Sequence, residues 1–370
     1  MSSKLNIGMV APTKAGKTSL MTAIFHDMAK KLAGNPQGIQ YWAANPATKA
    51  RIQRAIAEFK TVTSSDDIFE VPRMKGTQDS GHYQFAITVP ANKGTQRISL
   101  DILDYPGGFL GTPDFQSILP HLDESIALLV PVSSEIVMTW KMTDKVNNQL
   151  AIRKNIAARL MLEIDETVKA VNDWAKRRAK NSQPSIIVFV PVKCEAYFDD
   201  NGGHKNESDV LHEAVKELYI DALDLTDEER KYIQIETQAV DTYGIVEVRD
   251  IALKEEDGVE VLVSTFRKRL NCGNEIQMKG ALDVLAAVLS FYLNNLAATL
   301  GLQRSELERQ LKARGFLTDW WYKLFGKDPV KRAILDKIRE NEVAYHAIAE
   351  ITKLKTLGEA RTRMYNRVEW

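Results

Sequence analysis

Residues 5–22, LNIGMVAPTKAGKTSLMT, pass from a short apolar run through a loop of small residues into a segment with helical periodicity. The apolar run covers Leu5 to Val10, and after the loop apolar residues recur at the three- and four-residue spacing of a helix face. This order of strand, loop and helix predicts an α/β fold in which the loop follows the carboxyl end of the first strand.

The loop matches A-x-x-x-x-G-K-T, the phosphate-loop pattern with Ala11 in place of its first glycine. The backbone N–H groups of residues 14–18 would point at a β-phosphate, and the positive end of the next helix would add to their field. Gly16 would permit close approach, Lys17 would neutralise the β- and γ-phosphate oxygens, and Thr18 would offer its hydroxyl to Mg²⁺. The predicted nucleotide-binding residues of this loop are Thr13, Lys14, Ala15, Gly16, Lys17, Thr18 and Ser19.

Lys14 has two interpretations. It lies three residues before Lys17, whereas MinD-like ATPases carry their signature lysine five residues before, where this chain has Pro12. A resemblance to guanylate-binding proteins, which carry an arginine at the Lys14 place, implies a cation that folds back over the β- and γ-phosphates in cis as a catalytic group. The preference of lysine for water favours a solvent-facing side chain instead.

Asp104 lies at the end of a predicted hairpin. Residues 83–89 and 96–103 alternate between apolar and polar and flank a turn around Asn92. Asp104 then precedes Gly107 by three residues. A carboxylate at the end of a strand can hold Mg²⁺ through water, and the N–H of Gly107 can reach a γ-phosphate. The predicted metal ligands are therefore Thr18 and Asp104.

Together, the phosphate loop, the hairpin and the Asp104-x-x-Gly107 spacing resemble the P-loop GTPases of the TRAFAC class, which includes Ras-like, septin and dynamin-like proteins. The resemblance covers roughly residues 1–300. It implies an α/β P-loop NTPase fold of three layers, with a mostly parallel sheet and an antiparallel edge hairpin. An insertion at about 199–231 and an extra hairpin at about 244–266 are similar to bacterial GTPases associated with conflict or stress systems.

The resemblance also implies a base-reading motif, Asn/Thr-Lys-x-Asp, where this chain has Val192-Lys193-Cys194-Glu195 after an apolar run. In the family the lysine packs on the purine, and the carboxylate accepts hydrogen bonds from guanine that adenine cannot supply. Ala239, in Thr237-Gln238-Ala239-Val240, echoes a further family loop. Lys193, Glu195 and Ala239 are therefore candidate base contacts. Val192 lacks the polar first side chain, so an ATPase or kinase remains the alternative.

The family also places a threonine ahead of the hairpin, where its hydroxyl completes the Mg²⁺ shell and senses the γ-phosphate. Thr77 is the candidate for this catalytic and metal-binding role. An ordinary loop threonine is the other interpretation, and Thr61, Thr63 and Ser80 compete for the assignment.

No glutamine follows the Asp-x-x-Gly motif to orient an attacking water, because the chain has Gly108 and Phe109 there. We therefore expect slow hydrolysis unless a partner, a second protomer or a nearby cation such as Lys14 or Arg73 assists. The predicted function is a GTP-binding switch with Mg²⁺ as cofactor and GTP or GDP as ligand. A module that binds nucleotide without hydrolysing it is the other alternative.

Composition limits the other classes of function. The 370 residues include 49 Lys plus Arg and 49 Asp plus Glu, so the net charge is zero and no nucleic-acid partner is expected. Two cysteines cannot build a disulfide framework, and the first residues lack the apolar core of a secretory signal. These features predict a cytoplasmic protein. Histidine and cysteine spacing gives no metal motif.

Residues 303–370 are predicted to form a separate helical C-terminal module after a nucleotide domain at 1–302. The aromatic cluster from Trp320 to Phe325 fits packing against that domain better than contact with a membrane surface. Residues 284–302 carry no charge, but Asn294 and Asn295 favour a buried helix over a membrane span. The expected partners are a protein effector and a nucleotide-dependent second copy of the chain.

Overall fold

Short apolar runs alternate with amphipathic segments along the chain, and they form the strands and helices of an α/β fold. The computed structural model describes residues 2–33, 39–65, 68–70, 81–91, 94–201, 206–269, 277–313 and 359–369. The strands of the main sheet are β1 (Ser2–Met9), β2 (Gln40–Ala43), β4 (Gly81–Ala91), β5 (Gly94–Asp104), β6 (Ala127–Ser133), β7 (Ser185–Val192), β8 (Ile233–Gln238) and β11 (Thr362–Asn366).

Within the described ranges, these eight strands have the order β11-β8-β7-β6-β1-β5-β4-β2. The five strands from β8 to β5 are parallel, while β4, β2 and β11 pair with their neighbours in the antiparallel sense. Every residue of β6 and β7 is buried, as expected for strands covered on both faces. A mostly parallel mixed sheet and the antiparallel β4–β5 hairpin were both predicted, and both are confirmed.

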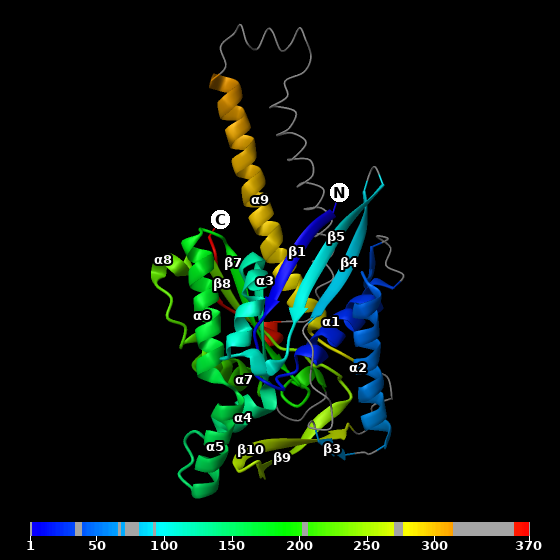
Figure 1. The fold of residues 1–370 in the computed structure, drawn as a ribbon, viewed down its shortest axis with the longest axis vertical. Coiled ribbons are helices and arrows are strands. Elements are labelled where there is room, and N and C mark those ends of the chain that lie inside the picture. The colour runs from blue at the N-terminus through cyan, green and yellow to red at the C-terminus, as the bar shows by residue number, and fades with distance from the viewer. Residues whose placement is uncertain are drawn as a thin grey trace.

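Helices cover both faces of this sheet (Figure 1). The helices are α1 (Lys17–Leu32), α2 (Pro46–Ser65), α3 (Leu119–Glu124), α4 (Ser134–Thr143), α5 (Gln149–Met161), α6 (Ile164–Lys180), α7 (Ser208–Val215), α8 (Asp227–Arg230) and α9 (Ala281–Ala313). One buried cluster joins the sheet to α1, α2 and α9, and another joins it to α3, α4, α6 and α7. The arrangement is compatible with a three-layer α/β fold.

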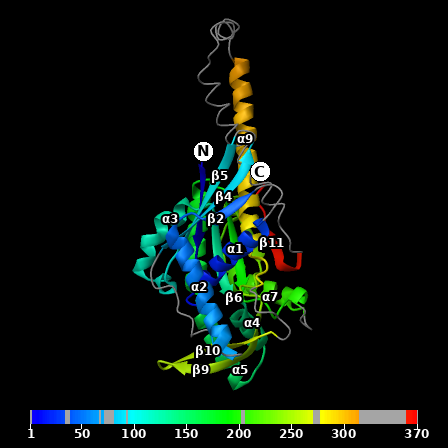
Figure 2. The same cartoon turned by 90° about the vertical axis from the view of Figure 1, so that its right-hand side faces the viewer.

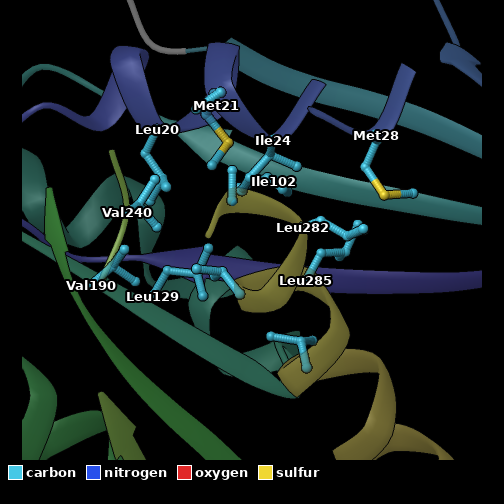
Figure 3. Packing of buried hydrophobic residues seen from close by; sticks show 14 of the residues in the cluster. Leu20, Met21, Ile24, Met28, Ile102, Leu129, Val190, Val240, Leu282 and Leu285 are labelled. Carbon is cyan, nitrogen blue, oxygen red and sulfur yellow. The ribbon is translucent and has the colours of Figure 1, made fainter. Parts of the chain in front are cut away.

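The first cluster fixes the position of α1. Leu20, Met21, Ile24 and Met28 of α1 are buried in the same layer as Ile102 of β5 and Leu282 and Leu285 of α9 (Figure 3). Because these side chains repeat at helical spacing, one face of α1 is packed against the sheet. The first residue of α1, Lys17, is thereby held at the end of β1.

A second sheet lies beyond the carboxyl edge of the main one (Figures 1 and 2). It consists of β3 (Ile68–Glu70), β10 (Val259–Lys268) and β9 (Val246–Glu256) in that order, all antiparallel. The β9–β10 hairpin turns at Asp257 and Gly258, both at positive φ, as the predicted hairpin at about 244–266 requires. The side of this hairpin that faces the main sheet lies close to the loop between β1 and α1.

Two sequence-based expectations are wrong. The apolar spacing of residues 39–59 predicts helix throughout, but residues 40–43 form an edge strand because they pair with β4. Residues 362–366 of the predicted helical tail form β11, because they pair with β8. The amphipathic stretch from about Thr143 to Lys180 is helical and forms α5 and α6, which meet at Glu163, whose φ is 41°. Helix α9 continues past residue 302. The predicted insertion at 199–231 contains α7, a π-helix at Lys216–Ile220 and α8.

One described helix segment, Ala281–Thr299 of α9, is long and apolar enough to cross a membrane, with a mean hydropathy of 1.5. Sixty-one per cent of its most apolar window is buried inside the protein. Its amino end packs against α1, and the N–H of Leu282 donates to Asp27 of α1. This burial is consistent with a core helix of a soluble protein.

Candidate phosphate-binding site

The loop at residues 11–16 follows β1 at the topological switch point of the sheet, between β5 and β6. In open α/β sheets ligands bind at the carboxyl ends of the strands at such a point. Lys14 and Gly16 adopt positive φ values of 60° and 100°, which curl the loop before α1 begins at Lys17. A Cβ at Gly16 would lie 3.1 Å from Cγ2 of Val192, so both the backbone angle and the space favour glycine.

Lys17 is buried at the start of α1. Its ammonium donates to the carbonyl oxygens of Ala11 and Pro12 at 3.3 and 3.4 Å. Burial lowers the pKa of Lys17, while the nearby carboxylates of Asp104 and Glu163 act to raise it. A lysine held this way inside the loop can exchange two backbone carbonyls for phosphate oxygens.

Thr18 and Asp104 both lie near the hydroxyl of Tyr83. The hydroxyl of Tyr83 is hydrogen-bonded to the Thr18 side chain, and Asp104 is close enough to add to the burial that raises the pKa of Tyr83. Asp104 is buried at the end of β5, followed by the short helix Gly107–Phe109. The residues predicted to ligate Mg²⁺ are therefore near each other, and a hydroxyl with a carboxylate is a donor set that suits this ion. The third predicted ligand, Thr77, lies outside the described residues, as does Arg73.

Lys193 and Glu195, at the carboxyl end of β7, both make protein contacts. The Lys193 ammonium is 2.7 Å from Oε1 of Glu135 and 3.0 Å from the Ser133 hydroxyl. Its Cε would be 3.9 Å from a Cβ at Gly16, so the stem of Lys193 borders the phosphate loop. The contact of Lys193 with a base stays a prediction.

The side chain of Glu195 makes its hydrogen bonds with the segment that follows β8. Its Oε1 accepts hydrogen bonds from the backbone N–H groups of Tyr243 and Gly244, both at 3.2 Å. Burial, with a contribution from the nearby Asp241, raises the pKa of Glu195 to about 7. The carboxylate thus holds the segment after β8, and the role in guanine recognition predicted for it stays a prediction.

The segment after β8 is held from two further sides. The N–H of Ala239, a predicted base contact, donates to the carbonyl of Arg361 at 2.9 Å. The hydroxyl of Tyr243 is 2.9 Å from that of Ser19, and the Tyr243 ring stacks on Phe59 at 3.6 Å between centroids. The segment after β8 is thus linked to Ser19 of α1 through Tyr243, and the roles of Ala239 and Ser19 in a nucleotide site stay predictions.

A pocket of about 200 Å³ lies beside the phosphate loop. Its walls come from the loop, the starts of α4 and α6, Lys193 and strand β10. Apolar side chains of Ile136, Leu162 and Val261 line it together with the carboxylates of Glu135 and Glu163. The pocket therefore brings two carboxylates, Glu135 and Glu163, and the side chain of Lys193 next to the loop that would hold phosphates.

Glu163 was not anticipated from the sequence. Its Oε1 accepts a hydrogen bond from the backbone N–H of Thr13 at 3.1 Å, although 150 residues separate the two. In the sequence it is one carboxylate among many at the start of an amphipathic helix, so no spacing rule selects it. Its unusual positive φ, 41°, is the only local sign, and that is visible only in the structure.

A second cluster of polar groups lies on β4, β5 and α3, where His82, Asp101 and His121 bring possible metal-ligating atoms within 4.8 Å. Nδ1 of His82 is 2.6 Å from Asp101, whose other oxygen is 3.2 Å from the ammonium of Lys4. Nε2 of His121 is 3.2 Å from the carbonyl of Ile7. These contacts give each of the three side chains a partner within the protein.

Comparison with known proteins adds no identification. No protein-family model matches the chain, and no curated protein matches it either. The aromatic cluster Trp320–Phe325, the predicted docking or packing surface of the tail, lies outside the described residues.

Proposed function

We propose that this protein binds a nucleoside triphosphate with Mg²⁺, hydrolyses it slowly and acts as a molecular switch. The observation that carries the proposal is the phosphate loop at the carboxyl end of the central strand β1. There the sequence A-x-x-x-x-G-K-T curls around the buried Lys17, and Thr18 and Asp104 both lie near the hydroxyl of Tyr83. Backbone N–H groups, a lysine and a helix amino end are the groups that bind triphosphates in P-loop proteins.

GTP is the nucleotide proposed first. It rests on the resemblance to TRAFAC GTPases, on the antiparallel hairpin that precedes Asp104, and on the stem of Lys193 beside Gly16. Under this proposal the protein works in the cytoplasm, with a protein effector or a second copy of the chain reading the nucleotide state.

A triphosphatase or kinase without guanine preference is the second candidate. It is favoured by the hydrogen bonds from Tyr243 and Gly244 to Glu195, because Oε1 of this carboxylate is engaged with the protein's own backbone. A module that retains nucleotide without turnover is distinguished from both by a hydrolysis assay.

The first experiment is to identify any nucleotide released from denatured protein and then to titrate GTP and ATP, each with Mg²⁺, into wild type and Lys17→Ala. We expect Lys17→Ala to weaken binding by about 100-fold, since charge-assisted hydrogen bonds contribute ~1.5–3 kcal/mol each. Lys30→Ala is the matched control, because Lys30 is an exposed lysine of the same helix, α1, and lies away from the loop. Equal binding by wild type and Lys17→Ala would contradict the proposal.

A further inference from the structure

Glu163 reaches the phosphate loop from the turn between α5 and α6. Its Oε1 accepts from the N–H of Thr13, the residue immediately before the N–H groups of residues 14–18 that would bind phosphate. The hydrogen bond therefore uses the N–H of Thr13, which is not one of the N–H groups of residues 14–18 predicted to point at the β-phosphate. Glu163 can stay in place while a nucleotide occupies the loop.

Glu163 lines the pocket beside the phosphate loop, together with Thr13 and Lys14 of that loop. Its charge acts to raise the pKa of the Lys17 ammonium, which would contact the β- and γ-phosphates. It also acts to raise the pKa of the Tyr105 hydroxyl. The charge of Asp104, which would hold Mg²⁺, acts to raise the pKa values of the same two groups. Glu163 and Asp104 are thus both near the buried ammonium of Lys17.

The backbone of Glu163 is held in an unfavourable conformation. Its φ and ψ are 41° and 49°, in the left-handed region that costs a residue with a Cβ about 1–2 kcal/mol. Glycine would adopt this turn without that cost. Strained residues gather at functional sites, and here the strain keeps a carboxylate against the phosphate loop.

We infer that Glu163 is the general base that orients and deprotonates the water that attacks the γ-phosphate. The inference rests on the proposed function, and it supplies the group that is missing after Asp104-x-x-Gly107, where Gly108 and Phe109 cannot hold a water through a side chain. Thr13 holds Oε1 of Glu163, and Oε2 takes the proton.

The step balances without any further reactant. The water oxygen forms a bond to the γ-phosphorus, and the bond from that phosphorus to the β–γ bridging oxygen breaks, with its electron pair passing to the diphosphate. The proton of the water passes to Glu163 and from there to the released phosphate. Lys17 and Mg²⁺ would neutralise the charge that develops on the leaving oxygen.

The test is single-turnover hydrolysis of GTP with Mg²⁺ by the full chain, with GTP affinity measured separately. We expect Glu163→Gln to lower the hydrolysis rate at least 100-fold, within the range of general-base contributions. Its affinity for GTP should stay within about threefold, because the amide oxygen can still accept from Thr13. Asp165→Asn removes the same charge from the exposed first turn of α6 and should hydrolyse GTP at the wild-type rate.

A further variant separates a base from a structural residue. Glu163→Asp, whose residue tolerates the left-handed region better, should fold and bind GTP normally but hydrolyse it slowly, because its carboxylate is one methylene further from the loop.

The outcomes that overturn the inference differ from those that overturn the proposed function. Unchanged hydrolysis by Glu163→Gln, or tighter GTP binding with an unchanged rate, would show that the carboxylate only occupies or repels the site. A wild type that binds GTP but never hydrolyses it would also remove the inference and leave nucleotide binding intact. A wild type that binds no nucleotide would overturn both.

Discussion

The ammonium of Lys193 lies 2.7 Å from Oε1 of Glu135, and this ion pair joins the end of β7 to the first turn of α4 beside the phosphate loop. The Glu135 side chain is only 2% exposed, and its Oε2 has no hydrogen-bond partner among the described residues. A buried carboxylate of this kind depends on its one cation.

Lys193→Met should therefore destabilise the protein by about 3–5 kcal/mol, because it leaves the charge of Glu135 buried and uncompensated. The double variant Lys193→Met with Glu135→Leu should recover most of that loss, since a buried ion pair replaced by apolar residues is often close to neutral. Urea denaturation of the two variants measures the difference. If the single variant is as stable as wild type, the pair does not hold this corner of the site.

Gly16→Ala should abolish nucleotide binding at a small cost in stability. The substitution puts a Cβ at φ 100° and only 3.1 Å from Val192, so the loop must shift away from the shape that points its N–H groups inward. Gly258→Ala is the control, because Gly258 also has a positive φ, 78°, but no atom within 4 Å of its added Cβ. Both should lose about 1–2 kcal/mol from the backbone angle. Calorimetric titration with GTP and Mg²⁺ should separate them, and wild-type affinity in Gly16→Ala would count against the loop.

Arg361→Met should destabilise the protein by about 3–5 kcal/mol and loosen the segment after β8. The guanidinium of Arg361 is 2% exposed, donates to both oxygens of Asp241 at 3.1 and 2.9 Å, and lies 4.1 Å from the centre of the Phe198 ring. Without it, Asp241 is a buried charge with its main cation removed. Arg363→Met is the control, since Arg363 pairs with the exposed Asp209. Equal melting temperatures of the two variants would contradict this prediction.

The sequence predicts the parts of the site that follow apolar strands and misses the parts that arrive from far along the chain. Apolar runs in the sequence predict the strands, and parallel strands bring their carboxyl ends to one edge of the sheet. Four predicted parts of the site lie at or just after such strand ends: the loop at 11–18, Asp104, Lys193 and Ala239. Glu163 and Arg361 could not be selected this way.

The fold shows the same division. Strand β2 is a four-residue edge strand, Gln40–Ala43, with no alternation long enough to outweigh the helical pattern around it. Strand β11, Thr362–Asn366, has a polar sequence and is a strand because it pairs with β8 more than 120 residues earlier. Pairing across such a distance leaves no local sequence pattern. The hairpins β4–β5 and β9–β10, in contrast, are predicted by the turn residues between their strands.

We expect the stability of the protein to depend on pH through His212, which lies where α7 meets the C-terminal segment. His212 is fully buried, with Nε2 3.0 Å from the carbonyl of Ala360 and Nδ1 2.7 Å from the hydroxyl of Thr237. In the neutral ring Nε2–H donates to Ala360 and Nδ1 accepts from Thr237, so both nitrogens are satisfied. Burial is the main cause that lowers the pKa of His212 to about 4, and Arg363 and Arg361 act in the same direction.

Because the folded-state pKa of His212 lies below its unfolded value of about 6.5, its neutral form stabilises the protein fully above pH 6.5. That contribution, at most about 3 kcal/mol, is lost as the pH falls from 6.5 towards 4. His212→Gln, which cannot be protonated, should show a flatter dependence of melting temperature on pH over this interval. Limited proteolysis should also release residues 359–370 from wild type more readily at pH 5 than at pH 7. Parallel pH profiles for wild type and His212→Gln would mean that this histidine does not control the attachment of β11.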